Sequence, residues 1–286
     1  MGNLEICSLE NISLKQVYEA FMESFSDYEI PMEMPIDQFE EMIITRDIDF
    51  GYSVGCFSDG KLVGFILCGY REIDGKKYCY NGGTGVIPSF RRKAIANDLF
   101  IKLVDLLKKD NVDIFLLEVL ENNTPAIDLY RKNGFGVQRR FKSFKINKED
   151  VLGVLANDYT VGYDKTNYVD IDEANFHPFM PSWQNQKISI LNNIDNYEYC
   201  SVSIDGEVIG FGFIHKKRGD IPQLRVLKGW ENKNLEQLIV SELKDKTESD
   251  VIKLVTLDES ISLIKILPDI GFSYFLGLYE MTFSLD

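Results

Sequence analysis

The segment from Val86 to Phe135 constrains the fold of this chain more than any other part of the sequence. A strand pattern ends at Pro88, and three consecutive basic residues, Arg91 to Lys93, then precede an amphipathic helix. The run Val112–Leu120 is almost continuously apolar, as expected of a buried parallel strand, and a second helix follows it. Two successive strand–helix units of this kind predict an α/β fold.

The other periodic segments of the first half complete this picture. Apolar residues at helical spacing predict helices over 13–25 and 36–44, and the second helix of the Val86–Phe135 segment begins at Asn123-Thr124-Pro125 and stops at Gly134. Alternating or β-rich runs predict the strands 4–9, 51–57, 62–70, 77–87 and 135–146. The predicted order of elements is β-α-α-β-β-β-α-β-α-β.

Length and composition exclude several classes of protein. With 286 residues, two domains of about 140 residues each are expected. No apolar run approaches the ~18 residues of a membrane span, and the first residues show no signal-peptide pattern, so we expect a soluble cytoplasmic protein without membrane binding. A net charge of −14 argues against nucleic acid as a partner. An oligomer is compatible with the sequence, which does not specify one.

Cysteine and histidine are too few and too scattered to form a reactive or metal-binding set. The five cysteines contain no Cys-x-x-Cys pair, and the only histidines are His177 and His215. We therefore expect neither a disulfide framework nor a metal site, and the scarcity of histidine argues against a Ser-His-Asp or Cys-His hydrolase. Carboxylates, phenols and backbone amides remain as the groups that can perform chemistry.

Charge is distributed unevenly along the chain. Residues 1–49 contain 12 acidic and 2 basic side chains, whereas residues 50–147 contain 10 acidic and 16 basic ones. Residues 148–286 are again acidic, with 23 acidic and 13 basic side chains. The basic middle segment suits an anionic ligand, although an ordinary solvated surface explains the same pattern equally well.

The second half of the sequence partly repeats the first. The hairpin signal Ser58-Asp59-Gly60-Lys61 has a counterpart in Ile204-Asp205-Gly206-Glu207, and the segment Leu129–Phe135 has one in Ile266–Phe272. The two matches occur in the same order at similar offsets, which indicates a duplicated unit. We therefore expect a domain over 1–147 and a related one over 148–286.

The residues between Val86 and Phe135 can bind an anion and transfer protons. A helix N-terminus offers unpaired N–H groups and a positive dipole end, and the Arg91–Lys93 cluster adds positive charge there. Glu118 ends the buried strand and Tyr130 lies two turns into the next helix, so both can face a common cleft. A carboxylate can take a proton from a protonated amine, and a phenol can supply a proton to a departing group.

This segment resembles the acyl-CoA-binding core of the GNAT superfamily of N-acetyltransferases. The resemblance covers residues 3–147 well and 165–286 loosely, and implies the mixed central sheet of the GNAT fold, duplicated in tandem, with acetyl-CoA as co-substrate. It implies that Tyr130 is the general acid and Glu118 the base, as in ribosomal-protein alanine acetyltransferases. It also implies coenzyme contacts by an extended set of residues: Val86 and Ile87 through backbone groups, the helix start Arg91, Arg92, Lys93, Ala94, Ile95 and Ala96, and Asn123.

The sequence departs from the family pattern at the helix start, because Ala94 and Arg92 replace residues that are commonly glycine. A β-carbon at Ala94 is expected to crowd a phosphate and to weaken coenzyme binding. A water relay could replace Glu118, and both Tyr130 and Glu118 could instead be structural.

The acceptor is expected to be a small-molecule or peptide amine. The resemblance implies that the segment around Asp27, Tyr28 and Glu29 lines the acceptor pocket, and its acidity favours a cationic amine.

The second copy is expected to be degenerate. When Val226 is aligned with Val86, carboxylates stand at Glu231 and Glu236 and Asn234 replaces Ala94, while Leu267 stands at the Tyr130 position. These carboxylates should repel a phosphate. Two other readings remain open: a tandem acyl or aminoacyl transferase acting on a bulky acceptor, and a non-enzymatic module that binds coenzyme A.

Overall fold

The structure is a computed structural model that describes residues 3–27, 34–156, 158–176, 180–231 and 233–285. It divides into two compact units, the first made of residues 1–138 and 279–286 and the second of residues 139–278. The division does not follow the expected boundary at 147/148. Two long strands, β6 (Gly136–Asn147) and β13 (Ser273–Ser284), each begin in one unit and end in the other.

The first unit has the element order that the sequence predicts. After residue 138 the chain leaves this unit and returns only with the end of β13. Its elements in chain order are β1 (Leu4–Ser8), α1 (Leu14–Ser24), α2 (Ile36–Thr45), β2 (Val54–Ser58), β3 (Lys61–Ile73), β4 (Lys76–Val86), a 3₁₀ turn (Pro88–Phe90), α3 (Ile95–Lys109), β5 (Ile114–Leu120), α4 (Thr124–Lys132) and the start of β6.

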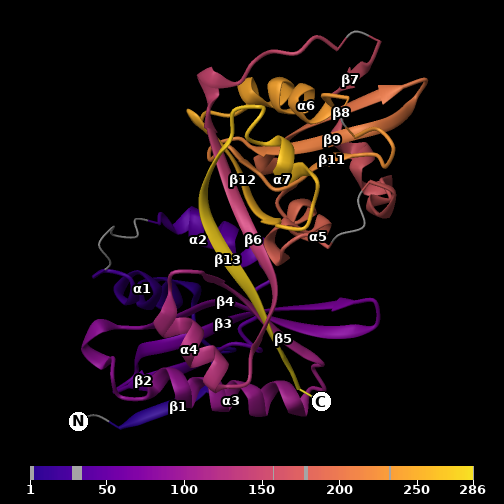
Figure 1. The fold of residues 1–286 in the computed structure, drawn as a ribbon. Coiled ribbons are helices and arrows are strands. Elements are labelled where there is room, and N and C mark those ends of the chain that lie inside the picture. Colours follow the sequence, from indigo (N-terminus) through magenta and orange to yellow (C-terminus); the bar gives the residue numbers. More distant parts are fainter. Residues whose placement is uncertain (1–2, 28–33, 157, 177–179, 232, 286) are drawn as a thin grey trace. The chain divides into compact units, whose positions relative to one another are not determined.

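The sheet of the first unit has the order β1-β2-β3-β4-β5-β13 (Figure 1). Neighbouring strands from β1 to β4 are antiparallel, whereas β4 and β5 are parallel. An apolar cluster lies on each face, because side chains alternate along the strands. One cluster packs against α3 and includes Leu99 and Leu103, and the other packs against α1 and α2 and includes Phe21 and Phe39.

Local sequence signals explain where these elements begin and turn. Ser13 and Gln16 form a reciprocal capping box at the start of α1. The hairpin between β2 and β3 turns at Asp59-Gly60, where both residues have positive φ (50° and 80°). Asp205-Gly206 adopts the same conformation in the second unit (49° and 84°), which confirms that the two hairpins are counterparts.

The C-terminal end of β13 completes the sheet of the first unit. The N–H of Leu285 donates to the carbonyl of Asp113, immediately before β5 (3.0 Å). The apolar side chains of Met281 and Leu285 are buried in the cluster on the α3 face. The last residues that the structure describes therefore belong to the core of the N-terminal unit.

The second unit contains two sheets. One has the order β13-β6-β12-β10 and the other β11-β9-β8-β7. Its own elements, apart from short 3₁₀ turns, are β7 (Thr160–Gly162), α5 (Lys187–Leu191), β8 (Tyr197–Ile204), β9 (Glu207–His215), β10 (Asp220–Ile221), β11 (Leu224–Val226), α6 (Leu235–Leu243), β12 (Val251–Asp258) and α7 (Leu263–Ile266).

The parallel pair β10–β12 corresponds to β4–β5 of the first unit. The counterpart of β4 is interrupted after Ile221: β10 pairs with β12, and β11 pairs with β9 in the other sheet. The same strand is continuous in the first unit, where β4 pairs with both of its neighbours.

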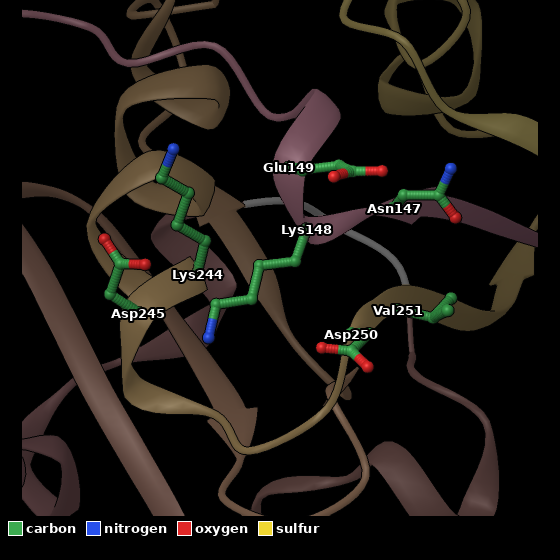
Figure 2. Close-up of a pocket in the computed structure, with 7 residues that line it drawn as sticks. All are labelled: Asn147, Lys148, Glu149, Lys244, Asp245, Asp250 and Val251. Atoms are coloured by element: carbon green, nitrogen blue, oxygen red, sulfur yellow. The ribbon is translucent and has the colours of Figure 1, made fainter.

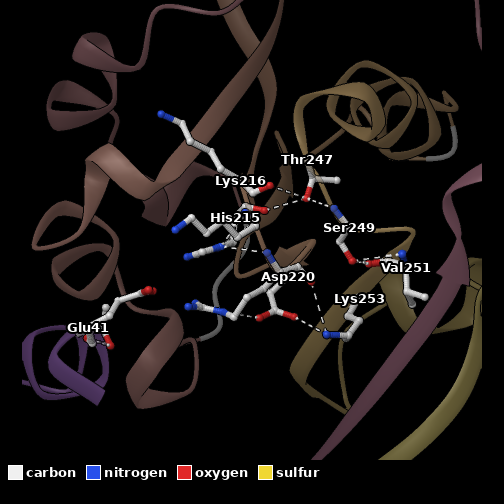
Figure 3. A network of polar contacts seen from close by, with 11 residues as sticks. Glu41, His215, Lys216, Asp220, Thr247, Ser249, Val251 and Lys253 are labelled. Carbon is white, nitrogen blue, oxygen red and sulfur yellow. Dashed lines mark hydrogen bonds and ion pairs between the residues drawn. The ribbon is translucent and has the colours of Figure 1, made fainter. Parts of the chain in front are cut away.

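A polar network ties the end of β9 to the start of β12 (Figure 3). Thr247 donates to the carbonyls of His215 and Lys216, each at 3.0 Å, and Lys253 donates to Asp220 at 3.2 Å. The His215 ring is buried, and its Nδ1 accepts two backbone N–H groups from the following turn. His215 is therefore a structural group, whereas His177 lies outside the described residues.

Candidate active site

A pocket of about 380 Å³ lies at the N-terminus of α3 in the first unit. Six of the residues predicted to bind a coenzyme line it: Val86, Arg91, Arg92, Ala94, Ile95 and Ala96. Five lining residues were not predicted as ligands: Thr84, Gly85, Phe90, Asn97 and Leu129. The end of β4, the α3 helix start and α4 therefore surround one space.

The backbone at the start of α3 adopts a conformation that usually requires glycine. Arg92 and Ala94 have φ values of 61° and 60°, in the left-handed region. Ala94 is the N-cap of α3, and its side chain cannot accept a hydrogen bond from the first turn. The orphan N–H groups of this turn are thus available to an anion, in keeping with the role predicted for this loop.

Arg91 is tied to neighbouring groups by four hydrogen bonds. Its Nε donates to the carbonyl of Val86 (3.1 Å), and one terminal nitrogen also donates to the carbonyl of Ser24 (2.7 Å). The two terminal nitrogens form a bidentate pair with Asp27 (2.7 and 2.8 Å). This hydrogen bonding with Arg91 lowers the pKa of the Asp27 carboxyl.

The structure thus brings together Arg91, predicted to bind coenzyme, and Asp27, predicted to bind the acceptor. Tyr28 and Glu29, the other residues predicted for the acceptor, lie outside the described residues.

The other two basic residues of the cluster are exposed. Lys93 places its ammonium group 4.3 Å from the ring centre of Phe90, and Arg92 lines the pocket. Charged groups at such positions can move to meet a ligand at low energetic cost.

The end of β4 turns some of its backbone groups toward the pocket rather than toward β3. Ile87 donates its N–H to Val63 of β3 (3.0 Å), so the alternation along the strand turns the backbone groups of Thr84 and Val86 away from β3. The ladder between β4 and β5 ends at Asn81–Leu117, before these positions are reached. An extended ligand can therefore pair with Thr84 and with the N–H of Val86 as an added strand, while the Val86 carbonyl accepts from Arg91.

The roles predicted for Ile87 and Asn123 stay predictions. The Ile87 side chain is buried, and its backbone N–H and C=O both make hydrogen bonds within the protein. Asn123 caps α4, where its side-chain oxygen accepts from the N–H of Ala126 (3.3 Å).

A β-bulge lies where β4 and β5 separate. The register of β3 and β4 shifts between Leu67–Gly83 and Cys68–Asn81, which leaves Gly82 as the extra residue. A β-carbon on Gly82 would lie 2.5 Å from the Ile48 side chain, so only glycine fits without a shift of that neighbour. The bulge re-aims the last residues of β4 away from β5.

Tyr130 lies on the α3 side of this separation. Its ring packs against Phe135, with 5.6 Å between ring centres. The Nδ2 of Asn81 lies 3.4 Å from the Tyr130 hydroxyl and 2.9 Å from the Thr84 hydroxyl. Asn81 was not among the predicted site residues, and the Asn-Gly-Gly sequence at the bulge was the signal that could have indicated it. Asn81 links the predicted acid to the strand that lines the pocket.

Glu118 lies on the opposite face of the sheet. Phe115, Leu117 and Val119 point into the cluster that also contacts Tyr130, so strand alternation directs Glu118 toward the α1–α2 face. Burial, followed by the charge of Glu118, raises the pKa of the neighbouring Tyr80 well above its usual range. The two predicted catalytic residues therefore lie on opposite faces of the sheet, near the point where β4 and β5 separate.

A larger pocket in the second unit has a different character. It has a volume of about 560 Å³ and is lined by Asn147, Lys148, Glu149, Lys244, Asp245, Asp250 and Val251 (Figure 2). Its lysines bind backbone carbonyls: Lys148 donates to Thr247 and Lys244 donates to Val151. No predicted catalytic or coenzyme-binding residue lines it.

The helix start of the second unit keeps the geometry of the first but not its chemistry. Asn234, the N-cap of α6, has a φ of 58°, which supports its alignment with Ala94. Glu236 is buried in the first turn of α6, and this burial raises the pKa of its carboxyl. Leu267, at the Tyr130 position, is completely buried.

No three His, Cys, Asp or Glu side chains within the described ranges are grouped so that they could hold a metal ion. No helix in the described part of the chain is long and apolar enough to cross a membrane.

Comparisons with known proteins bear on the family and the fold of this chain. Residues 14–135, which lie in the first unit, match the model of the acetyltransferase (GNAT) family, and the expected resemblance to this family is confirmed. No curated protein matches the chain in sequence.

Solved structures share the fold over the whole chain. A tandem GNAT protein from the clavulanic acid biosynthesis pathway has a TM-score of 0.72 and 14% identity, over 99% of both chains. A putative acetyltransferase from Pyrococcus horikoshii has a TM-score of 0.69 and 14% identity, over 98% of this chain and 89% of the other. A GCN5-related N-acetyltransferase from Sphaerobacter thermophilus has a TM-score of 0.71 and 12% identity, over 99% and 96%. The expected tandem GNAT fold is therefore confirmed.

Proposed function

We propose that this protein is an acetyl-CoA-dependent N-acetyltransferase that transfers an acetyl group to a primary amine, with the active site in the first unit. One observation carries the proposal: β4 lines the pocket at the α3 N-terminus with Thr84 and Val86, and its Asn81, where β4 and β5 separate, contacts Tyr130, while Glu118 stands on the opposite face. An anionic coenzyme and an amine can thus approach the same point from different sides. The location in the cytoplasm stays a prediction.

Each part of the site has a role in this reaction. The N-terminus of α3 and the exposed Lys93 hold the diphosphate, while Thr84 and Val86 pair with the extended arm. Glu118 takes a proton from the acceptor ammonium, directly or through water, and the amine nitrogen then attacks the thioester carbon. The carbon–sulfur bond breaks, and Tyr130 protonates the thiolate.

Coenzyme binding and turnover test the proposal separately. Calorimetry with acetyl-CoA should show binding at micromolar to millimolar concentration, and a thiol-release assay should show turnover with at least one amine from a panel of spermidine, glucosamine and a short peptide with a free N-terminus. Absence of binding to the folded protein at millimolar acetyl-CoA would refute the proposal. Binding without thiol release for a broad panel, unaffected by Tyr130→Phe, would identify a coenzyme-binding module instead.

A further inference from the structure

The C-terminal strand brings a second carboxylate to the first unit. Glu280 lies in the part of β13 that belongs to this unit, and it is 6% exposed. β13 is the neighbour of β5, the strand that carries Glu118. The position of Glu280 relative to Glu118 follows from the register of these two strands.

A backbone hydrogen bond sets this register. The N–H of Leu285, just after β13, donates to the carbonyl of Asp113, just before β5. Because the end of one strand lies beside the start of its neighbour, β5 and β13 are antiparallel. Glu280 is five residues before Leu285, and Glu118 is five residues after Asp113. In this register the two glutamates stand opposite each other. The two occupy a non-hydrogen-bonded position, where opposed side chains come closest.

Burial on the two faces agrees with this register. Tyr279, Met281, Phe283 and Leu285 all belong to the cluster on the α3 face, so Glu280 points to the other face. Glu118 also points there, because its neighbours Leu117 and Val119 are buried in that same cluster. Directly opposed residues of an antiparallel pair share a face, as these two do.

The other charged and titratable groups around this pair come from three elements. Tyr80 of β4 is buried, and the charges of Glu118, Arg46, Glu280 and Arg71 all act on its phenol. Arg46, just after α2, donates to the carbonyl of Gly82 at the bulge (2.7 Å). Arg71 of β3 is paired with Asp47 (2.6 Å). The two glutamates thus belong to a mixed cluster at the strand separation.

We propose that Glu280 is a positioning residue for Glu118: the carboxylate that β13 places opposite the base favours the transfer of the acceptor's proton to Glu118. This inference rests on the proposed acetyltransferase function. A second carboxylate directly opposite the base increases the base's affinity for a proton, because two like charges side by side repel each other.

The proton inventory balances. An ammonium group R–NH₃⁺ yields one proton to Glu118 before attack, and the nitrogen loses a second one after the C–N bond forms. Tyr130 gives a proton to the departing thiolate and regains one through solvent. One proton is therefore released to solvent for each acetyl group transferred.

The test is the pH dependence of kcat/KM, measured by thiol release with the amine of the panel that reacts fastest. Glu280→Gln should move the midpoint of the rising limb to lower pH by roughly one unit, because Glu118 then binds its proton less tightly. Glu118→Gln should lower the rate on the order of 10²-fold. Glu72→Gln removes an exposed carboxylate on β3 and serves as the matched control.

The outcomes separate this inference from the proposed function. An unchanged midpoint in a folded, active Glu280→Gln variant would overturn the role of Glu280 and leave the transferase intact. If the wild-type protein acetylates no amine, the proposed function itself fails. The pairing is then decided by thermal unfolding of both single variants and the double variant at pH 8: opposed carboxylates predict non-additive Tm changes, and additive changes overturn the pairing.

Discussion

The helix starts of the two units, before α3 and before α6, share a backbone and differ in charge. Ala94 and Asn234 have nearly the same φ, 60° and 58°, and each is the N-cap of its helix. Two positions further on, the first unit has the small side chain of Ala96 at the pocket, and the second has the buried carboxylate of Glu236. The comparison teaches that two related helix starts can keep one backbone conformation while the side chains and charges beside it differ.

The largest expected difference between the units concerns the proton donor. Tyr130→Phe should lower kcat on the order of 10²-fold, because the thiolate loses its acid, while the KM for acetyl-CoA changes little. Leu267→Met alters the equivalent position of the second unit and should leave kcat unchanged. Steady-state thiol release measures both variants. Equal activity of Tyr130→Phe and wild type would remove Tyr130 from the mechanism.

Coenzyme affinity should depend on the first helix start only. Lys93→Ala should raise the Kd of acetyl-CoA about 5-fold, which corresponds to the loss of one exposed charge contact of about 1 kcal/mol. Lys233→Ala, at the matching exposed position of the second unit, should have no effect. Calorimetry should give one bound coenzyme per chain, and a stoichiometry of two would contradict the comparison.

The buried carboxylate of Glu236 predicts a stability that depends on pH. Its pKa is raised in the folded state by burial, so the folded protein binds more protons and loses stability as the pH rises from the unfolded value of 4.5 through the folded one. One of its oxygens, Oε2, has no hydrogen-bond partner among the described residues. Glu236→Gln should therefore increase the free energy of unfolding by about 1 kcal/mol at pH 7 and have no effect near pH 3. Urea unfolding at both pH values is the measurement, and the same gain at both would contradict it.

The smallest effect concerns backbone strain. A left-handed conformation destabilises the folded state by roughly 1–2 kcal/mol when the residue is alanine. Glycine removes this strain, but its greater freedom in the unfolded chain destabilises the folded state by about 0.4–1 kcal/mol. Ala94→Gly should thus stabilise the protein by about 0.5–1 kcal/mol in urea unfolding. Asn234→Gly should be close to neutral, since asparagine tolerates this conformation. A loss of stability in Ala94→Gly would show that the methyl group contributes favourable contacts.

Much of the fold was predictable because it depends on local patterns. Helical periodicity placed α1 and α3, and the Asp-Gly turns revealed the duplicated hairpins. Within the site, the cluster of basic residues and the apolar strand before Tyr130 located the pocket. Each of these signals lies within one short stretch of the chain and needs no knowledge of distant contacts.

Features that depend on distant contacts escaped sequence reasoning. A strand pattern such as that of β13 does not specify its partner, so nothing in residues 279–285 indicated that they join the first unit. For the same reason Glu280 was not recognised. The left-handed backbone of Arg92 and the pairing of Arg91 with Asp27 also arise from the packed structure rather than from local preference.

The placement of residues 279–285 beside β5 also has a consequence for how the chain matures. During synthesis the N-terminal residues emerge first and can begin to fold, yet β5 keeps an open edge until the second half has been made. The proposed active site therefore becomes complete only late in translation. A chain that ends before Tyr279 would leave the edge of β5 uncovered, and this edge could pair with strands of other chains. Premature termination would therefore lead to aggregation rather than to active enzyme.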